Sequence, residues 1–217
     1  MDAYAIESLA RAKRAIESGA FRREITPVEI ALRGGATVIS DDEQPLKADP
    51  SRIPTLKPAF AKDGAITAAN ASSISDGAAA LVLMRASTAE ALGLSPVARI
   101  AGHGAHAHEP GLFTTAPVPA MQKALARAGW SVGEVDLFEV NEAFAVVAMI
   151  AQRELGIDRD RLNVNGGACA LGHPIGASGA RILTTLLAAL EARGEARGLA
   201  SLCIGGGEAV AMAVERI

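Results

Sequence analysis

The sequence has few aromatic residues, no long apolar run and no excess of basic charge, and each shortage excludes a class of protein. Tryptophan, tyrosine and phenylalanine make up 3% of the 217 residues, and the formal net charge is −3. Binding to nucleic acid calls for clustered basic residues and stacking platforms, so nucleic acid is not an expected partner. The longest wholly apolar run covers residues 143–151, far short of the roughly 20 residues of a membrane-spanning helix.

Cysteine is also scarce, since the chain holds only Cys169 and Cys203. No Cys-x-x-Cys pair and no disulfide-rich spacing is present, which favours a reducing compartment. The amino-terminal stretch is amphipathic and lacks the apolar segment of a signal peptide. With 50% hydrophobic and 21% charged residues, the composition is that of a globular protein with an aliphatic core. We therefore expect a soluble, cytoplasmic protein.

The first 95 residues show several different patterns. Apolar residues recur at helical spacing over residues 2–18, where Asp2 can cap the start and Gly19 ends the helix. Residues 22–62 are dense in proline and glycine, which predicts an irregular, loop-rich region. A continuous apolar run then predicts a buried strand over residues 80–84. Ser87 and Glu90 have the spacing of a capping box for a short helix.

The remainder of the chain alternates between strand and helix patterns. This alternation is typical of an α/β fold with a mostly parallel sheet, helices on its faces and a closing antiparallel hairpin. Strands are expected at residues 97–103, 135–140, 162–165, 199–204 and 208–214, and helices at residues 119–128, 142–155 and 178–192.

The stretch NGGACALGHPIGASGARI, residues 165–182, is rich in glycine and contains one histidine. Its spacing matches neither a Walker A loop nor the dinucleotide fingerprint, so it is not expected to bind phosphate. His173 precedes Pro174, a position biased toward extended backbone. Two interpretations stay open at this point: a structural histidine flanked by glycines, or a histidine directed into a cavity.

Two further polar residues follow predicted strands. Cys203 lies in LCIGGG, where it is either a small buried hydrophobe or a thiol within reach of glycine amides. Asn141 lies in VNEAFA, where it either caps the next helix or emerges at the sheet edge. If the strands at 162–165 and 199–204 form a parallel pair, Asn141, His173 and Cys203 meet at one edge.

A histidine cluster invites a test for metal binding. His103, His106 and His108 lie close together in HGAHAHEP, but no other residues obviously complete a tetrahedral site, so no metal is expected. Cys169 is expected to pack rather than to react.

Four motifs together resemble the thiolase family: KDGAITAANASSISDGAAALVLM, VNEAFA, NVNGGACALGHPIGASGARI and LCIGGGEAVAMAVERI. The resemblance is strongest to its acetyl-CoA acetyltransferase branch. It implies an α/β, thiolase-like fold in which the C-terminal βαβαβαββ half has a mixed sheet covered by helices. By this resemblance, residues 1–74 are part of a lid subdomain, residues 75–95 the last segment of the N-terminal half, and residues 96–217 the C-terminal domain.

The resemblance also implies a reaction, namely the Claisen condensation of two acetyl-CoA molecules to acetoacetyl-CoA and the reverse thiolysis. His173 would activate a nucleophilic thiol and help to hold the thioester oxygen. Cys203 would remove the α-proton, and Asn141 would position a water in an oxyanion hole. The α-proton of a thioester is weakly acidic, so a cysteine whose pKa is lowered by a histidine and backbone amides would suit its removal.

The resemblance also assigns residues to substrate binding. Ser72 would contact the pantetheine of coenzyme A, with Phe60, Ala68 and Phe144 as walls and Gly205 near the reacting thioester. The coenzyme A thioester is the substrate, and no cofactor is implied. A homo-oligomer is expected when the enzyme is complete.

The sequence departs from the family pattern in two places. The Cys-x-x-x-x-Gly-Ser segment of the family's nucleophile is not among these residues, and HEPGLFTTAPVPA differs from the usual segment, which leaves the acyl-chain preference open. Three interpretations follow for the chain: part of a thiolase that needs an N-terminal half or subunit and is inactive alone, a non-catalytic acyl-CoA-binding protein, or an inactive fragment with exposed apolar surface.

Overall fold

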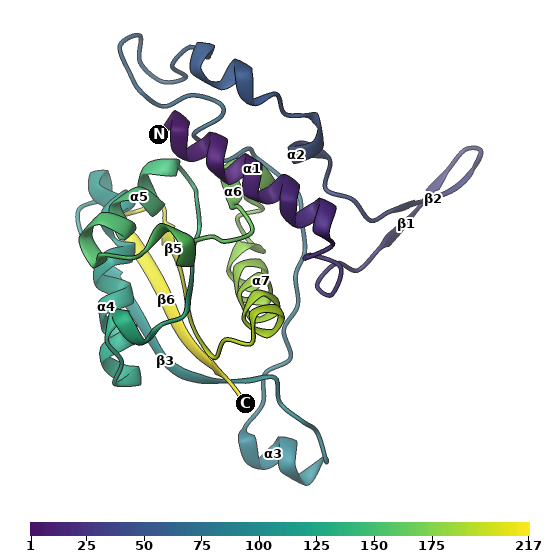
Figure 1. Cartoon of the computed structure of the whole chain (residues 1–217), viewed down its shortest axis with the longest axis vertical. Helices are drawn as coiled ribbons and strands as arrows, with labels where there is room; N and C mark the ends of the chain where they lie inside the picture. The colour runs from purple at the N-terminus through teal and green to yellow at the C-terminus, as the bar shows by residue number, and fades with distance from the viewer.

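The computed structural model describes all residues from 1 to 217, and its centre is a four-stranded mixed sheet with helices on both faces (Figure 1). The strand order is β3-β6-β5-β4, in which β4 and β5 are parallel and the other two pairs antiparallel. The strands are β1 (Val28–Leu32), β2 (Gly35–Ile39), β3 (Ala98–Ala107), β4 (Leu137–Val140), β5 (Arg197–Ile204) and β6 (Glu208–Arg216).

Seven α-helices and four short 3-10 helices connect these strands. The α-helices are α1 (Asp2–Ser18), α2 (Glu43–Lys47), α3 (Ala86–Ala91), α4 (Pro117–Ala128), α5 (Ala145–Leu155), α6 (Ala168–Leu171) and α7 (Ser178–Arg193). The 3-10 helices are η1 (Pro50–Thr55), η2 (Pro110–Thr115), η3 (Val132–Glu134) and η4 (Arg159–Arg161). None of the helices combines the length and the apolar composition needed to cross a membrane.

The core lies on both faces of the four-stranded sheet. One face packs against α4 and α5 and holds the largest buried cluster, which includes Met121 and Phe138. Leu137, the neighbour of Phe138 on β4, belongs to the smaller cluster under α7, as the alternation of side chains along a strand requires. Helix α4 lies so close to β3 that a Cβ on Gly104 would come within 2.2 Å of a helix carbonyl oxygen.

The predicted helices are largely confirmed, and the predicted sheet is partly wrong. The sheet is mixed rather than mostly parallel, and residues 162–165 do not form a strand. Only one bridge joins Leu162 to Phe138 there. The next residue, Asn163, has a positive φ of 46°, and its side chain bonds both backbone groups of Val140. A side chain thus replaces the ladder of backbone bonds that a strand would make.

Helix α1 covers the predicted residues 2–18 and ends at Gly19, whose φ of 75° is left-handed. Glycine adopts this conformation without a steric penalty. The predicted cap is wrong, however, because Met1 occupies the cap position and no side chain bonds the helix start. The Asp2 carboxylate instead accepts a hydrogen bond at 2.8 Å from the side-chain amide of Asn70.

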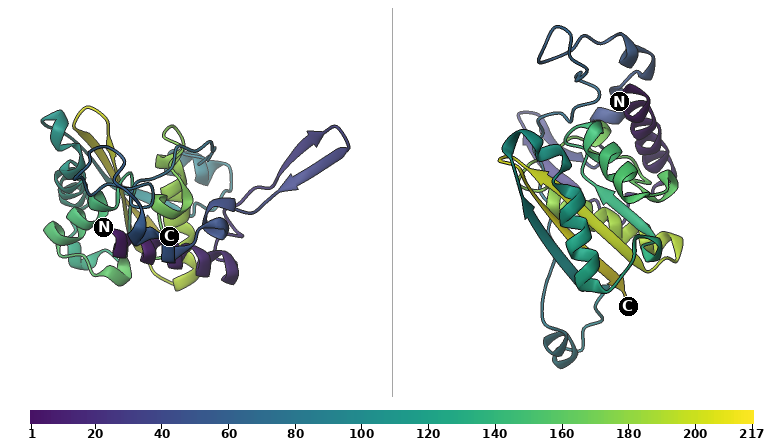
Figure 2. Two further views of the ribbon diagram at one scale, coloured as in Figure 1. Left: turned by 90° about the horizontal axis from the view of Figure 1, so that it is seen from above. Right: turned by 90° about the vertical axis from the view of Figure 1, so that its left-hand side faces the viewer.

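The region 22–62 is less irregular than predicted. Strands β1 and β2 form an antiparallel hairpin that projects from the body of the molecule (Figure 2), followed by α2 and η1. Every residue of both strands is exposed. The alternating pattern VEIAL before Arg33 and Gly34 was a hairpin signal that the glycines and prolines nearby obscured.

The buried strand predicted at residues 80–84 is also wrong. Residues 76–85 belong to no helix or strand and pair with no other segment, and most of their side chains are exposed. An extended segment becomes a strand only when a neighbouring strand takes up its backbone groups. The short helix that follows, α3, is confirmed, but its cap residue is Arg85 and no capping box forms. Exposed large apolar side chains in this region are Ile74, Val82, Leu83 and Met84.

Candidate active site

Asn141 and His173 come together at the end of β4. Asn141 follows the strand directly, and its backbone N–H donates to Ser201 of β5 at 2.9 Å. Its side-chain nitrogen lies 3.3 Å from His173 Nε2. Asn141 is 1% exposed, and its amide oxygen is buried without a hydrogen-bond partner in the chain. An acceptor at the site therefore remains free.

The contact with His173 decides between the two interpretations of Asn141. Asn141 does not cap α5, because that helix begins at Ala145 with Phe144 in the cap position, three residues later than predicted. Residues 143–144 stay extended since they pair with residues 71–72: Ser72 N–H donates to the Ala143 carbonyl at 3.0 Å. This pairing places the VNEAFA segment beside residues 71–72.

Ser178 fixes the orientation and the tautomer of His173. The Ser178 hydroxyl, on the first residue of α7, donates to the Pro174 carbonyl at 3.0 Å, and its oxygen lies 2.6 Å from His173 Nδ1. Because the hydroxyl proton is already used, Nδ1 is the donor in this pair. Nε2 then carries the lone pair and accepts from the Asn141 amide. Ser178 was not among the site residues predicted from the sequence, although its place in GASGAR, five residues after His173, is a usable signal.

Burial and a nearby cation keep His173 neutral. Removal from water, and secondarily the positive charge of Arg181, lower the pKa of His173 below its ordinary value. A lowered pKa leaves the imidazole uncharged at neutral pH, so Nε2 keeps a lone pair that can take a proton in place of the Asn141 hydrogen bond. Backbone contacts hold the ring's position, because His173 N–H donates to Ser73 at 3.2 Å.

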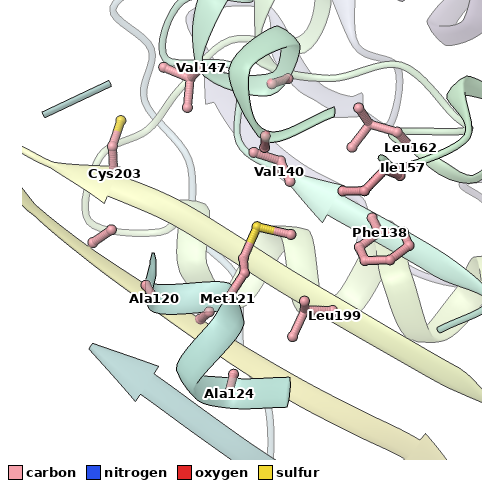
Figure 3. Packing of buried hydrophobic residues seen from close by; sticks show 14 of the residues in the cluster. Ala120, Met121, Ala124, Phe138, Val140, Val147, Ile157, Leu162, Leu199 and Cys203 are labelled. Carbon is pink, nitrogen blue, oxygen red and sulfur yellow. The ribbon is translucent and has the colours of Figure 1, made fainter. Parts of the chain in front are cut away.

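Cys203 lies near the end of β5 and is buried in the main core, with 7% exposure (Figure 3). Its sulfur makes no hydrogen bond with Asn141, His173 or the glycine amides that follow it. Burial raises the pKa of Cys203 to about 11. The sequence-based expectation of a lowered pKa is therefore wrong for this chain, because burial outweighs the lowering effect of the residue's own backbone N–H, and no cation lies close enough to add to that effect.

The residues predicted to bind substrate are distributed around the VNEAFA segment. The Ser72 hydroxyl donates to the Ala143 carbonyl at 3.1 Å. The ring of Phe144 contacts Phe60 edge-on, with centroids 6.4 Å apart. Phe60, which is 77% exposed, Ala68 and Gly205 lie at the surface. Ser72, Phe60 and Phe144 thus form one connected group, and a Cβ on Gly205 would meet only open space.

The remaining candidates from the sequence are the histidine cluster and Cys169. His106 and His108 contact each other edge-on, while no three His, Cys, Asp or Glu side chains converge in a way that could hold a metal ion. The Cys169 thiol is buried and donates to the Glu142 carbonyl at 3.8 Å. Burial, reinforced by Glu142, raises the Cys169 pKa.

Two family models match almost the whole chain. The model described as "Thiolase, C-terminal domain" matches residues 94–216, and "Thiolase, N-terminal domain" matches residues 1–87. The chain belongs to the thiolase family. The acetyl-CoA acetyltransferase of Escherichia coli K12 is 52% identical over 217 residues, and the cytosolic acetyl-CoA acetyltransferase of Mus musculus is 48% identical over 218 aligned positions.

Solved thiolase structures show the same fold. The acetyl-CoA acetyltransferase of Bacillus anthracis matches with a TM-score of 0.96 at 44% sequence identity. Human mitochondrial 3-ketoacyl-CoA thiolase, solved in complex with CoA, matches with a TM-score of 0.89 at 36% sequence identity. Both matches cover 100% of this chain. The predicted thiolase-like α/β fold, with its mixed sheet and covering helices, is confirmed. The chain spans about half the length of the relatives it matches, 55% for the E. coli protein.

Proposed function

We propose that this thiolase chain supplies the proton-transfer side of an acetyl-CoA acetyltransferase site, which joins two acetyl-CoA molecules to acetoacetyl-CoA and catalyses the reverse thiolysis. The observation that carries the proposal is the Asn141–His173–Ser178 arrangement, in which a neutral histidine has Nε2 aligned by a buried amide. Family membership and relatives named acetyl-CoA acetyltransferase support it.

His173 has the protonation state that its proposed role needs. Its Nε2 lone pair would accept the proton of a nucleophilic thiol, and the resulting imidazolium would donate from Nε2 to a thioester oxygen. Asn141 would hold a water that donates to the same oxygen, using its free amide oxygen as the acceptor. Both groups would stabilise the negative charge that develops as the enolate forms.

Cys203 would act as the base that removes the α-proton of acetyl-CoA. The resulting enolate would attack the acyl group carried by a nucleophilic cysteine, which leaves as a thiolate. In the isolated chain the Cys203 pKa of about 11 makes the thiolate scarce at neutral pH. We propose that the partner segment places a further positive or donating group close to its sulfur.

The proposed substrate is a coenzyme A thioester, held by Ser72 with Phe60, Ala68 and Phe144 as walls and Gly205 near the thioester. The human mitochondrial relative solved in complex with CoA supports this assignment. The chemistry consists of proton and acyl transfers, so we propose that no metal or redox cofactor takes part. Relatives that include a cytosolic mouse protein support a cytoplasmic location.

A second polypeptide segment is part of the proposal, because the sequence holds no cysteine in a Cys-x-x-x-x-Gly-Ser context. The unpaired apolar segment around Val82 and Leu83, which are 88% and 65% exposed, is a surface that such a segment would cover. We propose the family's N-terminal half or an equivalent subunit as this partner, with a homo-oligomer as the assembled state. The lack of an acyl-accepting cysteine also favours a second candidate, a non-catalytic acyl-CoA-binding protein.

An assembly experiment separates these functions. The purified chain alone is expected to show no thiolysis of acetoacetyl-CoA, because no acyl-accepting cysteine is present. Addition of a polypeptide made from the part of the E. coli relative that this chain does not span should restore thiolysis, followed by loss of the enolate absorbance of acetoacetyl-CoA.

The control is the same polypeptide without this chain, which should be inactive. Strong thiolysis by the chain alone would overturn the argument about the nucleophile. Binding of acetyl-CoA without any thiolysis in a stable two-part complex would favour the non-catalytic candidate.

A further inference from the structure

A fully buried carboxylate lies immediately beside the proposed catalytic amide. Glu142 follows Asn141 in the chain and is 0% exposed. Its Oε1 accepts hydrogen bonds from the Tyr4 hydroxyl at 3.0 Å and from the Asn163 amide at 2.9 Å. Its Oε2 accepts from the Ser8 hydroxyl at 2.7 Å and from the backbone N–H of Cys169 at 3.1 Å. Four donors from three segments, namely α1, Asn163 and Cys169, therefore converge on one side chain.

The hydrogen bonds of Glu142 join two distant parts of the sequence. Tyr4 and Ser8 lie on α1, within the part matched by the N-terminal family model, and Glu142 lies in the part matched by the C-terminal model. Burial, and secondarily the nearby Glu142, raise the pKa of Tyr4 well above its ordinary value. The phenol thus remains protonated and keeps donating. A buried carboxylate of this kind is tolerated because its acceptor sites are occupied.

The glycines of the 165–182 loop make this arrangement possible. A Cβ on Gly167 would lie 2.3 Å from the carboxyl carbon of Glu142, and one on Gly166 would lie 2.6 Å from the Ser8 carbonyl oxygen. Gly167 N–H also donates to the Ser8 hydroxyl oxygen at 3.0 Å. The paired glycines therefore let the backbone approach both Glu142 and α1, which explains a motif that phosphate binding does not explain.

The hydrogen bonds of Glu142 fix the two segments that carry Asn141 and His173. Asn163, bonded to Glu142, also accepts from Val140 N–H at 2.8 Å and donates to the Val140 carbonyl at 2.8 Å, which fixes the strand end that precedes Asn141. On the other side, the loop fastened at Cys169 N–H continues through α6 to His173 within four residues. Movement of Glu142 would shift Asn141 and His173 relative to each other.

We propose that Glu142 is a positioning residue that couples helix α1 to the Asn141–His173 pair, so that the first helix of the chain holds the proposed catalytic groups in register. This inference rests on the proposed function for the meaning of that pair, but the geometry it predicts can be measured without any catalysis. Removal of the charge should loosen two loops at once, because hydroxyl donors and a backbone N–H lose a shared acceptor.

The test is nuclear magnetic resonance of the imidazole nitrogens in the 217-residue chain. The His173 signals are assigned as those absent from His173→Gln. Glu142→Gln is expected to shift them away from the pattern of a neutral ring with Nδ1 protonated and Nε2 hydrogen-bonded, because Asn141 no longer lies in register. Tyr4→Phe combined with Ser8→Ala removes two donors and keeps the carboxylate, and should shift the same signals in the same direction by less.

Leu9→Ala is the matched control, since Leu9 lies on the same helix and packs in a separate cluster with Ile53 and Ala170. It should lower the melting temperature and leave the His173 signals unchanged. Unchanged His173 signals in Glu142→Gln would overturn the proposal. An equal shift in Leu9→Ala would also overturn it, because general loosening of α1 would then suffice.

If Glu142→Gln does not fold, the variant that combines Tyr4→Phe with Ser8→Ala tests the coupling. Unshifted His173 signals in this double variant would contradict the proposal. Failure of the two-part assembly to catalyse thiolysis would refute the proposed function and leave these signals unaffected. The two proposals can therefore fail separately.

Discussion

Replacement of Cys203 by serine in the assembled two-part enzyme is expected to slow carbon–carbon bond formation severely while acyl-enzyme formation continues. A serine hydroxyl is a far weaker base than a thiolate, and loss of a general base lowers a rate by about 10³-fold. Condensation is followed by the appearance of acetoacetyl-CoA, and acylation by transfer of label from acetyl-CoA to the nucleophile-bearing polypeptide. The condensation rate should fall by about 10³-fold, and the extent of acylation should stay near that of the unsubstituted enzyme.

Cys169→Ala is the matched control for this experiment. Cys169 is the other cysteine of the chain, and its thiol donates a hydrogen bond to the backbone carbonyl of Glu142 at 3.8 Å. The variant should condense acetyl-CoA at nearly the original rate. Unimpaired condensation by Cys203→Ser would remove Cys203 from the role of base, and an equal loss in both variants would point to packing rather than to proton transfer.

Introduction of a methyl group at Gly167 is expected to destabilise the fold severely. The new Cβ of Gly167→Ala would lie 2.3 Å from the carboxyl carbon of Glu142, and this fully buried carboxylate is held by four hydrogen-bond donors. Overpacking of this kind costs about 3 kcal/mol, and displacement of a buried charge from its donors adds to that cost. Urea-induced unfolding of the chain, followed by circular dichroism, measures the change.

Gly179→Ala provides the comparison within the same glycine-rich motif. A Cβ at Gly179 would meet nothing within 4 Å, and alanine favours the first turn of α7 over glycine by up to about 1 kcal/mol. This variant should be as stable as the original chain or more stable. Equal destabilisation of the two variants would show that the loop tolerates no substitution for reasons unrelated to Glu142.

The sequence alone predicted the long helices well because their signals are local. Helix α1 has both its apolar spacing and its terminating Gly19 within 18 residues, and α7 likewise ends at Gly194 with a left-handed φ of 69°. The family resemblance rested on motif order and was confirmed by the two matching family models. Asn141 and His173 were also brought together as expected, although the strand pairing predicted to do so was wrong.

The failed predictions depended on interactions that distant segments supply. Residues 80–84 were expected to be a buried strand, but no other strand of the chain pairs with them. Residues 162–165 do not form the predicted strand, because the Asn163 side chain hydrogen-bonds the backbone of Val140 in place of a ladder of backbone bonds. Glu142 went unnoticed since its donors Tyr4 and Ser8 lie more than 130 residues earlier, and no spacing rule connects such residues.

The expected pKa of Cys203 was wrong for a related physical reason. A cysteine beside glycines has backbone amides nearby in sequence, but the structure places the thiol in the apolar cluster between the sheet and α4–α5. Burial therefore dominates and raises the pKa to about 11. The direction of the shift depends on which groups surround the sulfur, and the sequence does not display those groups.

The most direct test of the account is the wash-in of deuterium from D2O into the acetyl methyl group of acetyl-CoA, because it isolates the proton-transfer step assigned to Cys203. The account predicts exchange by the two-part enzyme, none by the nucleophile-bearing polypeptide alone, and a loss of about 10³-fold with Cys203→Ser. Undiminished exchange in the assembled Cys203→Ser enzyme would contradict the claim that this chain supplies the base.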